Sequence, residues 1–80
     1  MSALNLVFNC QGNMITMQCM SNEILSDVYQ RFCNKIGKNM SDCKFYYNTQ
    51  EILPCNKTLE NLQLKNFFTF TVIVSNVIGA

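Results

Sequence analysis

The chain has no histidine and no tryptophan, and it has one proline and three isolated glycines among its 80 residues. Without histidine, neither a Cys–His nucleophile pair nor the usual base of acid–base catalysis is available. Isolated glycines do not form a glycine-rich loop that cradles phosphate groups. The acidic residues fall in predicted surface turns or on a helix face: Glu23, Asp27, Asp42, Glu51 and Glu60. We therefore predict that the chain is not an enzyme and uses no cofactor.

Charge is also scarce, because charged residues make up 14% of the chain and the net charge is +1. Nucleic-acid binding needs a clustered basic surface, which this balance does not favour. Arg31, Lys35 and Lys38 would form one helical stripe, although a solvated helix face is the better interpretation. No apolar run approaches the roughly 20 residues of a membrane span, and the N-terminus lacks the pattern of a secretory signal. We expect a cytoplasmic or nuclear protein with no nucleic-acid or membrane partner.

Cysteine is abundant by contrast, with five in the chain. Their odd number, even spacing and apolar neighbours favour reduced thiols packed as small hydrophobes over a disulfide scaffold. No CxxC pair occurs, so a structural zinc site lacks its usual close-spaced ligands and we expect no metal. We predict that Cys19 and Cys33 are buried, whereas Cys10 and Cys55 lie near turns and are candidates for exposed, redox-active thiols.

The first part of the chain predicts a β-hairpin. Hydrophobic residues are 49% of the sequence, which is typical of a globular chain, and the length suits one small domain. Apolar residues alternate at 4–8 and again at 15–19, the pattern of strands with one buried face. Gly12 lies between them and can adopt a positive φ without steric cost. These features predict an antiparallel hairpin at residues 4–20.

The periodicity then changes to that of a helix with one apolar stripe. The stripe consists of Leu25, Val28, Tyr29, Phe32 and Ile36. We expect the short polar side chains at 21–23 to cap the start of this helix and Gly37 to end it in a left-handed conformation. The helix must cover one face of the sheet, because no other segment carries such a stripe.

Two more strands are predicted after the helix. Aromatic side chains mark a strand at residues 44–48, with Phe45 on one face and Tyr46 on the other. A turn follows, and Ile52-Leu53 predicts a short strand that ends before Pro54, which has no N–H to donate to a ladder.

The last part of the chain combines a compact turn at 58–64 with a strand whose apolar residues alternate from 68 to 74. The order of elements is therefore ββαββ, with a short helical turn before the last strand. This order predicts an α+β domain in which one helix packs across a mixed sheet. We place the domain at residues 1–76 and a short tail at 77–80.

These residues resemble the ubiquitin-like β-grasp family over essentially the whole chain. The matching features are the Gly12 hairpin, the helix that ends at Gly37, the strand Lys44-Phe45-Tyr46-Tyr47, Ile52, and Thr58-Leu59-x-x-Leu62-x-Leu64. The resemblance implies a non-enzymatic domain that binds a protein partner through a shallow apolar patch. That patch would lie on the sheet face opposite the helix.

Candidate contact residues are those that alternate out of phase with the core. They are Val7, Lys44, Tyr46, Thr71 and Ile73. An exposed aromatic beside a β-branched residue suits an interface, and Lys44 would orient a partner through a carboxylate. The competing interpretation is that they are good strand formers on a half-exposed sheet. By the resemblance, Tyr46 and Thr71 stand where ubiquitin has an aliphatic residue and a histidine, so we do not expect ubiquitin's own receptors as partners.

Two other functions of the same fold stay open. Conjugated modifiers end in Gly-Gly, whereas this chain ends Ile78-Gly79-Ala80, so conjugation would go through Gly79 after removal of Ala80. A small-GTPase-binding domain would need basic residues along its second strand, and residues 14–20 have none. We favour a non-conjugating interaction module that is a monomer or a domain of a larger protein, with an unidentified protein as its partner.

Overall fold

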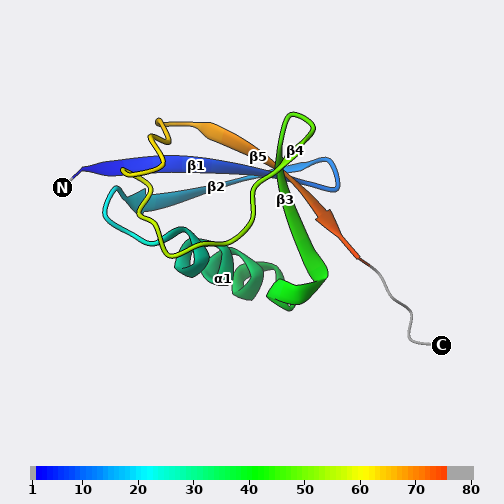
Figure 1. Cartoon of the computed structure of the whole chain (residues 1–80). Coiled ribbons are helices and arrows are strands. Elements are labelled where there is room, and N and C mark those ends of the chain that lie inside the picture. Colours follow the sequence, from blue (N-terminus) through cyan, green and yellow to red (C-terminus); the bar gives the residue numbers. More distant parts are fainter. Residues whose placement is uncertain (1, 76–80) are drawn as a thin grey trace.

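The computed structural model describes residues 2–75, which form a five-stranded mixed sheet with one α-helix packed across it (Figure 1). The elements are β1 (Ala3–Cys10), β2 (Asn13–Met20), α1 (Leu25–Ile36), the 3-10 turn η1 (Met40–Asp42), β3 (Cys43–Tyr47), β4 (Gln50–Glu51) and β5 (Phe68–Val74). The strand order is β2-β1-β5-β3-β4, in which β1 and β5 are parallel and the other pairs are antiparallel. The predicted α+β arrangement is confirmed, and the predicted tail at 77–80 lies outside the described residues.

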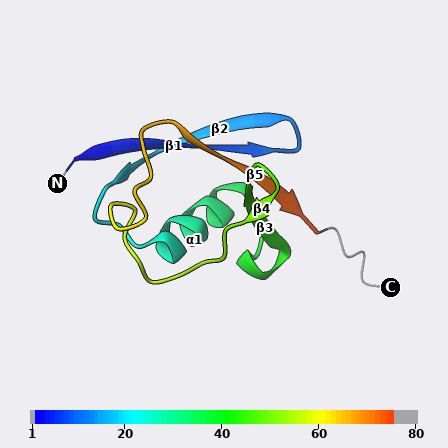
Figure 2. The same cartoon turned by 45° about the horizontal axis from the view of Figure 1, so that its top comes forward.

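The helix lies against one face of the sheet, and the long segment between β4 and β5 passes around it (Figure 2). This segment returns through the predicted helical turn, which is closed by the N–H of Leu62 donating to the carbonyl oxygen of Thr58 at 3.1 Å. The Thr58 hydroxyl accepts the N–H of Asn61 at 3.0 Å, as an N-cap side chain does. Leu59 is fully buried beneath the turn. The turn therefore anchors the segment before β5 begins.

The start of α1 differs from the sequence prediction that polar side chains before the helix cap it. The N-cap residue is Ile24, and among the described residues no side chain accepts a capping hydrogen bond from the first N–H groups of the helix. Instead, the N–H groups of Leu25 and Ser26 donate to the carbonyl oxygens of Lys57 and Cys55 at 3.0 and 3.1 Å. The passing loop thus satisfies two of the free N–H groups that a helix start leaves.

Positive φ angles occur where the prediction placed turns. Gln11 and Gly12, with φ of 54° and 84°, form the two-residue turn between β1 and β2. Gly37 ends α1 with φ of 71°, and its N–H donates to a carbonyl of the last helical turn. Both predicted glycine positions are confirmed.

Strand β4 lies two residues before the strand predicted at 52–53. Tyr47 pairs with Gln50, which leaves only two residues for the turn between β3 and β4. Pairing therefore starts immediately after the turn. It begins at polar residues, and the sequence pattern there does not predict a strand. The N–H of Ile52 still donates to the carbonyl oxygen of Phe45 at 2.8 Å, so the ladder reaches one residue further before Pro54.

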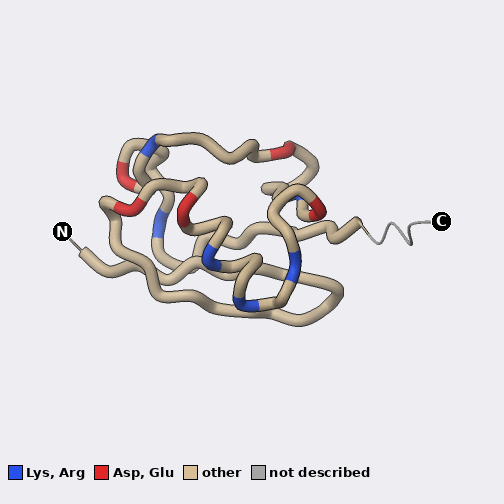
Figure 3. Tube along the Cα trace, turned by 90° about the horizontal axis from the view of Figure 1, so that it is seen from below, with Lys and Arg blue, Asp and Glu red and all other residues tan. Residues whose placement is uncertain are grey.

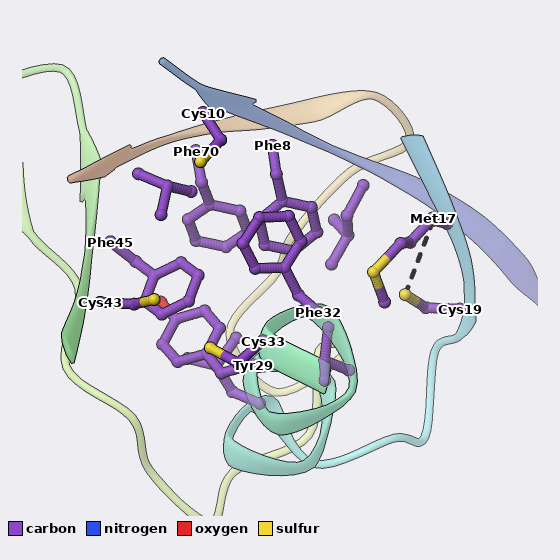
Figure 4. Close-up of a cluster of buried hydrophobic side chains, with 14 of the residues drawn as sticks. Phe8, Cys10, Met17, Cys19, Tyr29, Phe32, Cys33, Cys43, Phe45 and Phe70 are labelled. Carbon is purple, nitrogen blue, oxygen red and sulfur yellow. Dashed lines mark hydrogen bonds between the residues drawn. The ribbon is translucent and has the colours of Figure 1, made fainter. Parts of the chain in front are cut away.

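Five aromatic rings fill the space between the sheet and α1 (Figure 4). They belong to Phe8, Tyr29, Phe32, Phe45 and Phe70, and each is at most 2% exposed. Phe8 stacks on Phe32 and Phe70, with ring centroids 4.4 and 5.2 Å apart. Tyr29 stacks on Phe45 at 3.7 Å, and its hydroxyl donates to the carbonyl oxygen of Ile52 at 2.9 Å. That hydrogen bond offsets the cost of burying a phenol.

We predict that Phe8→Ala lowers the free energy of unfolding by about 3–5 kcal/mol, because it empties the centre of a packed aromatic cluster. Denaturant unfolding followed by circular dichroism measures the change. The matched control is Leu53→Ala, at a side chain that is 65% exposed, for which we expect a change within about 0.5 kcal/mol. A loss at Phe8 no larger than that at Leu53 would contradict the described core.

Candidate interaction surface

The candidate residues lie on the face of the sheet opposite α1, here called the outer face. Side chains of a strand alternate between the two faces. In β5, Val72 is buried in the core, so its neighbours Thr71 and Ile73 face outward. The same alternation in β3 sends Lys44 and Tyr46 to the outer face. The four side chains on β3 and β5 therefore face outward as predicted, because their neighbours along each strand are buried in the core.

Four of the five candidates are directly paired. Lys44 lies opposite Ile73, and Tyr46 lies opposite Thr71, in the antiparallel pairing of β3 with β5. Residues opposite each other have Cβ atoms only about 4.5–5.5 Å apart, so these side chains interact. We call these four residues the β3–β5 block. Ile73 is 52% exposed, Lys44 and Thr71 are exposed, and Tyr46 is half-buried.

Val7 is the candidate that lies apart from the block. Its partners in the sheet are Thr16 on one side and Thr69 on the other. Thr71 instead lies beside Asn9, two residues further along β1. Val7 is only 8% exposed, because it occupies the middle of the sheet with a strand on each side. It therefore offers little surface to a partner, although it was predicted as a contact residue.

Residues that the alternation along β3 and β5 does not mark also border the block. Asn9 is the neighbour of Thr71 on β1, and Glu51 is the neighbour of Tyr46 on β4. A cavity of about 330 Å³ opens between the β1–β2 turn and the second half of β5. It is lined by Asn9, Gln11, Gly12 and residues 71–74. Periodicity along one strand does not reveal these neighbours, because they depend on how β1, β4 and β5 align.

The chemistry of this surface suits recognition. The cavity combines the amide groups of Asn9 and Gln11 with the apolar side chain of Ile73. Lys44 within the block and Glu51 beside it carry opposite charges, so neither sign dominates. Within residues 2–75, no three cysteine or carboxylate side chains gather as a metal site. In the same part of the chain, no helix has the length and apolar character of a membrane span.

Four of the five thiols lie in the core and Cys55 is half-buried. Cys19 and Cys33 are buried as predicted. Cys10 is also buried, contrary to its candidacy as an exposed thiol, because it continues the inward alternation of β1. Burial, and then a hydrogen bond with Cys43, raises the pKa of the Cys33 thiol to about 12. A thiol with so high a pKa is protonated at neutral pH and is a poor nucleophile.

Comparison with known proteins bears on the fold. No protein-family model matches the sequence, and no curated protein matches it. The structure is similar to that of ubiquitin from Caldiarchaeum subterraneum, with a TM-score of 0.83 and 16% identity over 98% of this chain and 100% of that one. It is also similar to the ubiquitin-like domain of an Arabidopsis thaliana protein, with a TM-score of 0.82 and 12% identity over 100% of this chain and 85% of that one. Identities this low show a shared fold and do not transfer partners.

We predict that thiol-reactive probes distinguish the cysteines of the native protein. Cys55 should react first, whereas Cys19 and Cys33 should react only as fast as the domain opens, because no thiolate is accessible to the reagent. Mass spectrometry of peptides from a labelling time course measures each rate. In denaturant all five should react at similar rates, and fast labelling of Cys33 in the native protein would contradict its placement.

Proposed function

We propose that this chain, which has the ubiquitin-like β-grasp fold, is a non-enzymatic module that binds a protein partner through the outer face. The observation that carries the proposal is the direct pairing of Tyr46 with Thr71 and of Lys44 with Ile73. This pairing joins two strands that are distant in sequence into one block beside a cavity. Protein interfaces combine an apolar centre with a polar rim, and the block with its border has both.

Ile73 is the centre of the proposed contact. Ile73 is 52% exposed, so a partner that covers it would remove apolar surface from water. Burial of apolar surface gives about 25 cal/mol per Å², so covering this side chain is a substantial contribution. Tyr46 lies diagonally across the block and is already half-buried, so ordering it on binding costs little side-chain entropy.

Polar groups at the border of the block would set the orientation of the partner. The amides of Asn9 and Gln11 line the cavity and offer both donors and acceptors. Lys44 lies opposite Ile73 and Glu51 lies opposite Tyr46, so each contact residue has one charged neighbour across the ladder. Charges at the rim of an interface contribute mainly to specificity and association rate, so we assign most of the affinity to Ile73 and Tyr46.

We expect Tyr46→Ala and Ile73→Ala each to weaken binding of the natural partner by at least about tenfold, the size of loss that hot-spot truncations give. A pulldown identifies the partner, and calorimetric titration of the purified pair measures the affinity. The control is Tyr47→Ala, which removes a partly exposed aromatic of the same strand from the opposite face, where it stacks on Phe68. If Tyr46→Ala and Tyr47→Ala weaken binding equally while all variants stay folded, the outer face is not the binding surface.

The conjugated modifier remains the competing function, and it depends on Gly79 and Ala80, which lie outside the described residues. A modifier predicts covalent adducts of higher mass that persist in a denaturing gel. For an interaction module we expect the tagged chain to run only at its own mass in extracts of its source cells. Adducts that disappear in a Gly79→Ala variant would establish conjugation instead.

A further inference from the structure

Two of the buried thiols lie at the contact between α1 and β3. Tyr29 of α1 stacks on Phe45 of β3, with ring centroids 3.7 Å apart. Cys33 lies one helical turn beyond Tyr29 on the same face of α1. Cys43 lies two residues before Phe45 on the same face of β3. Each of these steps covers about 6 Å along its element, so the thiols extend the contact that the rings make.

Cys33 and Cys43 meet through their side chains. The two thiols share a hydrogen bond, and both lie beside the stacked rings of Tyr29 and Phe45 (Figure 4). Cys33 is fully buried and Cys43 is 8% exposed. A disulfide needs two cysteines whose side chains point toward each other across neighbouring segments. This pair meets that requirement.

Cys10 and Cys55 are poorly placed to compete for either member of the pair. Cys10 of β1 and Cys43 of β3 lie on opposite sides of β5, so two strand spacings, about 9.5 Å, separate their strands. Disulfides join residues whose Cα atoms are at most about 7 Å apart. The carbonyl oxygen of Cys55 accepts the N–H of Ser26 at 3.1 Å. That position is about 10 Å along the helix axis from Cys33.

We propose that Cys33 and Cys43 are a modification site, at which a small anionic disulfide compound such as oxidised glutathione forms a reversible protein disulfide. The Cys43 thiolate attacks first, because Cys43 has the exposed surface of the pair, and it displaces one thiolate to leave a mixed disulfide. Cys33 then loses its proton and attacks the Cys43 sulfur, which releases the second thiolate. Two protein thiols are thereby oxidised by two electrons, and the compound is reduced to two thiols.

The charge around the pair favours an anionic compound. The segment 31–44, which contains both cysteines, has four basic residues and one acidic residue, Asp42. Most Lys and Arg positions lie along one side of the molecule, away from most Asp and Glu positions (Figure 3). A positive field raises the local concentration of an anion and the rate at which it arrives.

Access to the thiols depends on opening of the segment that joins α1 to β3. Burial raises the pKa of the Cys33 thiol to about 12, so this thiol is protonated while the domain is closed. Separation of the last turn of α1 from β3 admits the compound. When the segment closes again, the second step is intramolecular and the two sulfur atoms are already adjacent. Oxidation is therefore slow to begin and selective for this pair.

The disulfide would close the chain between α1 and β3 into a loop. This loop contains Gly37, which ends the helix, and the 3-10 turn η1. Cys43 also pairs with Val74, so the bond would hold the first residue of β3 beside β5. Cross-links stabilise a domain mainly because they restrict its unfolded chain. The pair shares no residue with the β3–β5 block, so this proposal stands independently of the proposed function.

The probe is glutathione, applied to the purified full chain in mixtures of its reduced and oxidised forms. Free thiols are blocked by alkylation, and the disulfides are mapped by mass spectrometry. Trypsin cleaves after lysine and arginine, so Cys33 and Cys43 fall on separate peptides, 32–35 and 39–44. We expect these two peptides joined. The equilibrium for oxidation of the pair should be about a hundredfold more favourable in the native protein than in denaturant.

Matched variants and a second compound sharpen the test. Cys10→Ala removes a buried thiol outside the pair and should leave the joined peptides in place, whereas Cys33→Ala should abolish them, with both folds checked by circular dichroism. Cystamine, a cationic disulfide, should oxidise the pair several-fold more slowly than oxidised glutathione, and added salt should reduce the difference. The oxidised wild type should unfold at a temperature higher by roughly 10 °C or more.

Four results would overturn this proposal. They are equal oxidation equilibria in the native and denatured chain, a disulfide that joins Cys10 to Cys43, oxidation by cystamine at least as fast as by oxidised glutathione, and an unfolding temperature that oxidation does not raise. Mapping of the wild type needs no variant, so an unfolded Cys33→Ala protein would not weaken the test. None of these measurements involves the outer face, so the two claims fail separately.

Discussion

The insertion of β5 between β1 and β3 is the constraint on which the rest of the structure depends. Phe70 holds the register, because its ring stacks on Phe8 and meets Phe45 edge-on at 6.3 Å. A shift of one residue would turn Phe70 and Val72 toward solvent and would expose the core. The same register places Thr71 beside Tyr46 on the opposite face. The packing of the buried face thus determines which side chains meet on the outer face.

The proposed contact surface is made by side chains of two strands that are distant in sequence. In the β3–β5 block, Ile73 is exposed and Lys44 lies opposite it, while Glu51 lies opposite Tyr46 on β4. One charge of each sign therefore lies beside the two side chains to which we assign most of the affinity.

Features set by local sequence were predictable, and features set by register were not. The apolar stripe and Gly37 correctly predicted the residue at which α1 ends, because glycine readily adopts the left-handed conformation that ends a helix. The outward orientation of Tyr46 and Ile73 followed from period-2 alternation. The capping of α1 by loop carbonyls, the burial of Val7 and the position of Asn9 beside Thr71 depend on contacts between distant segments. Periodicity within one segment carries no information on such contacts.

Site-specific photocrosslinking tests the central claim, that the outer face binds a partner protein, most directly. A photoreactive phenylalanine derivative replaces Asn9, at the border of the block, in one variant and Lys57 in another, and both are irradiated in cells that express the chain. We predict discrete protein adducts from position 9 that disappear when Tyr46→Ala is added, and none from position 57. Adducts of equal yield from both positions, or none from position 9 in a folded protein, would contradict the account.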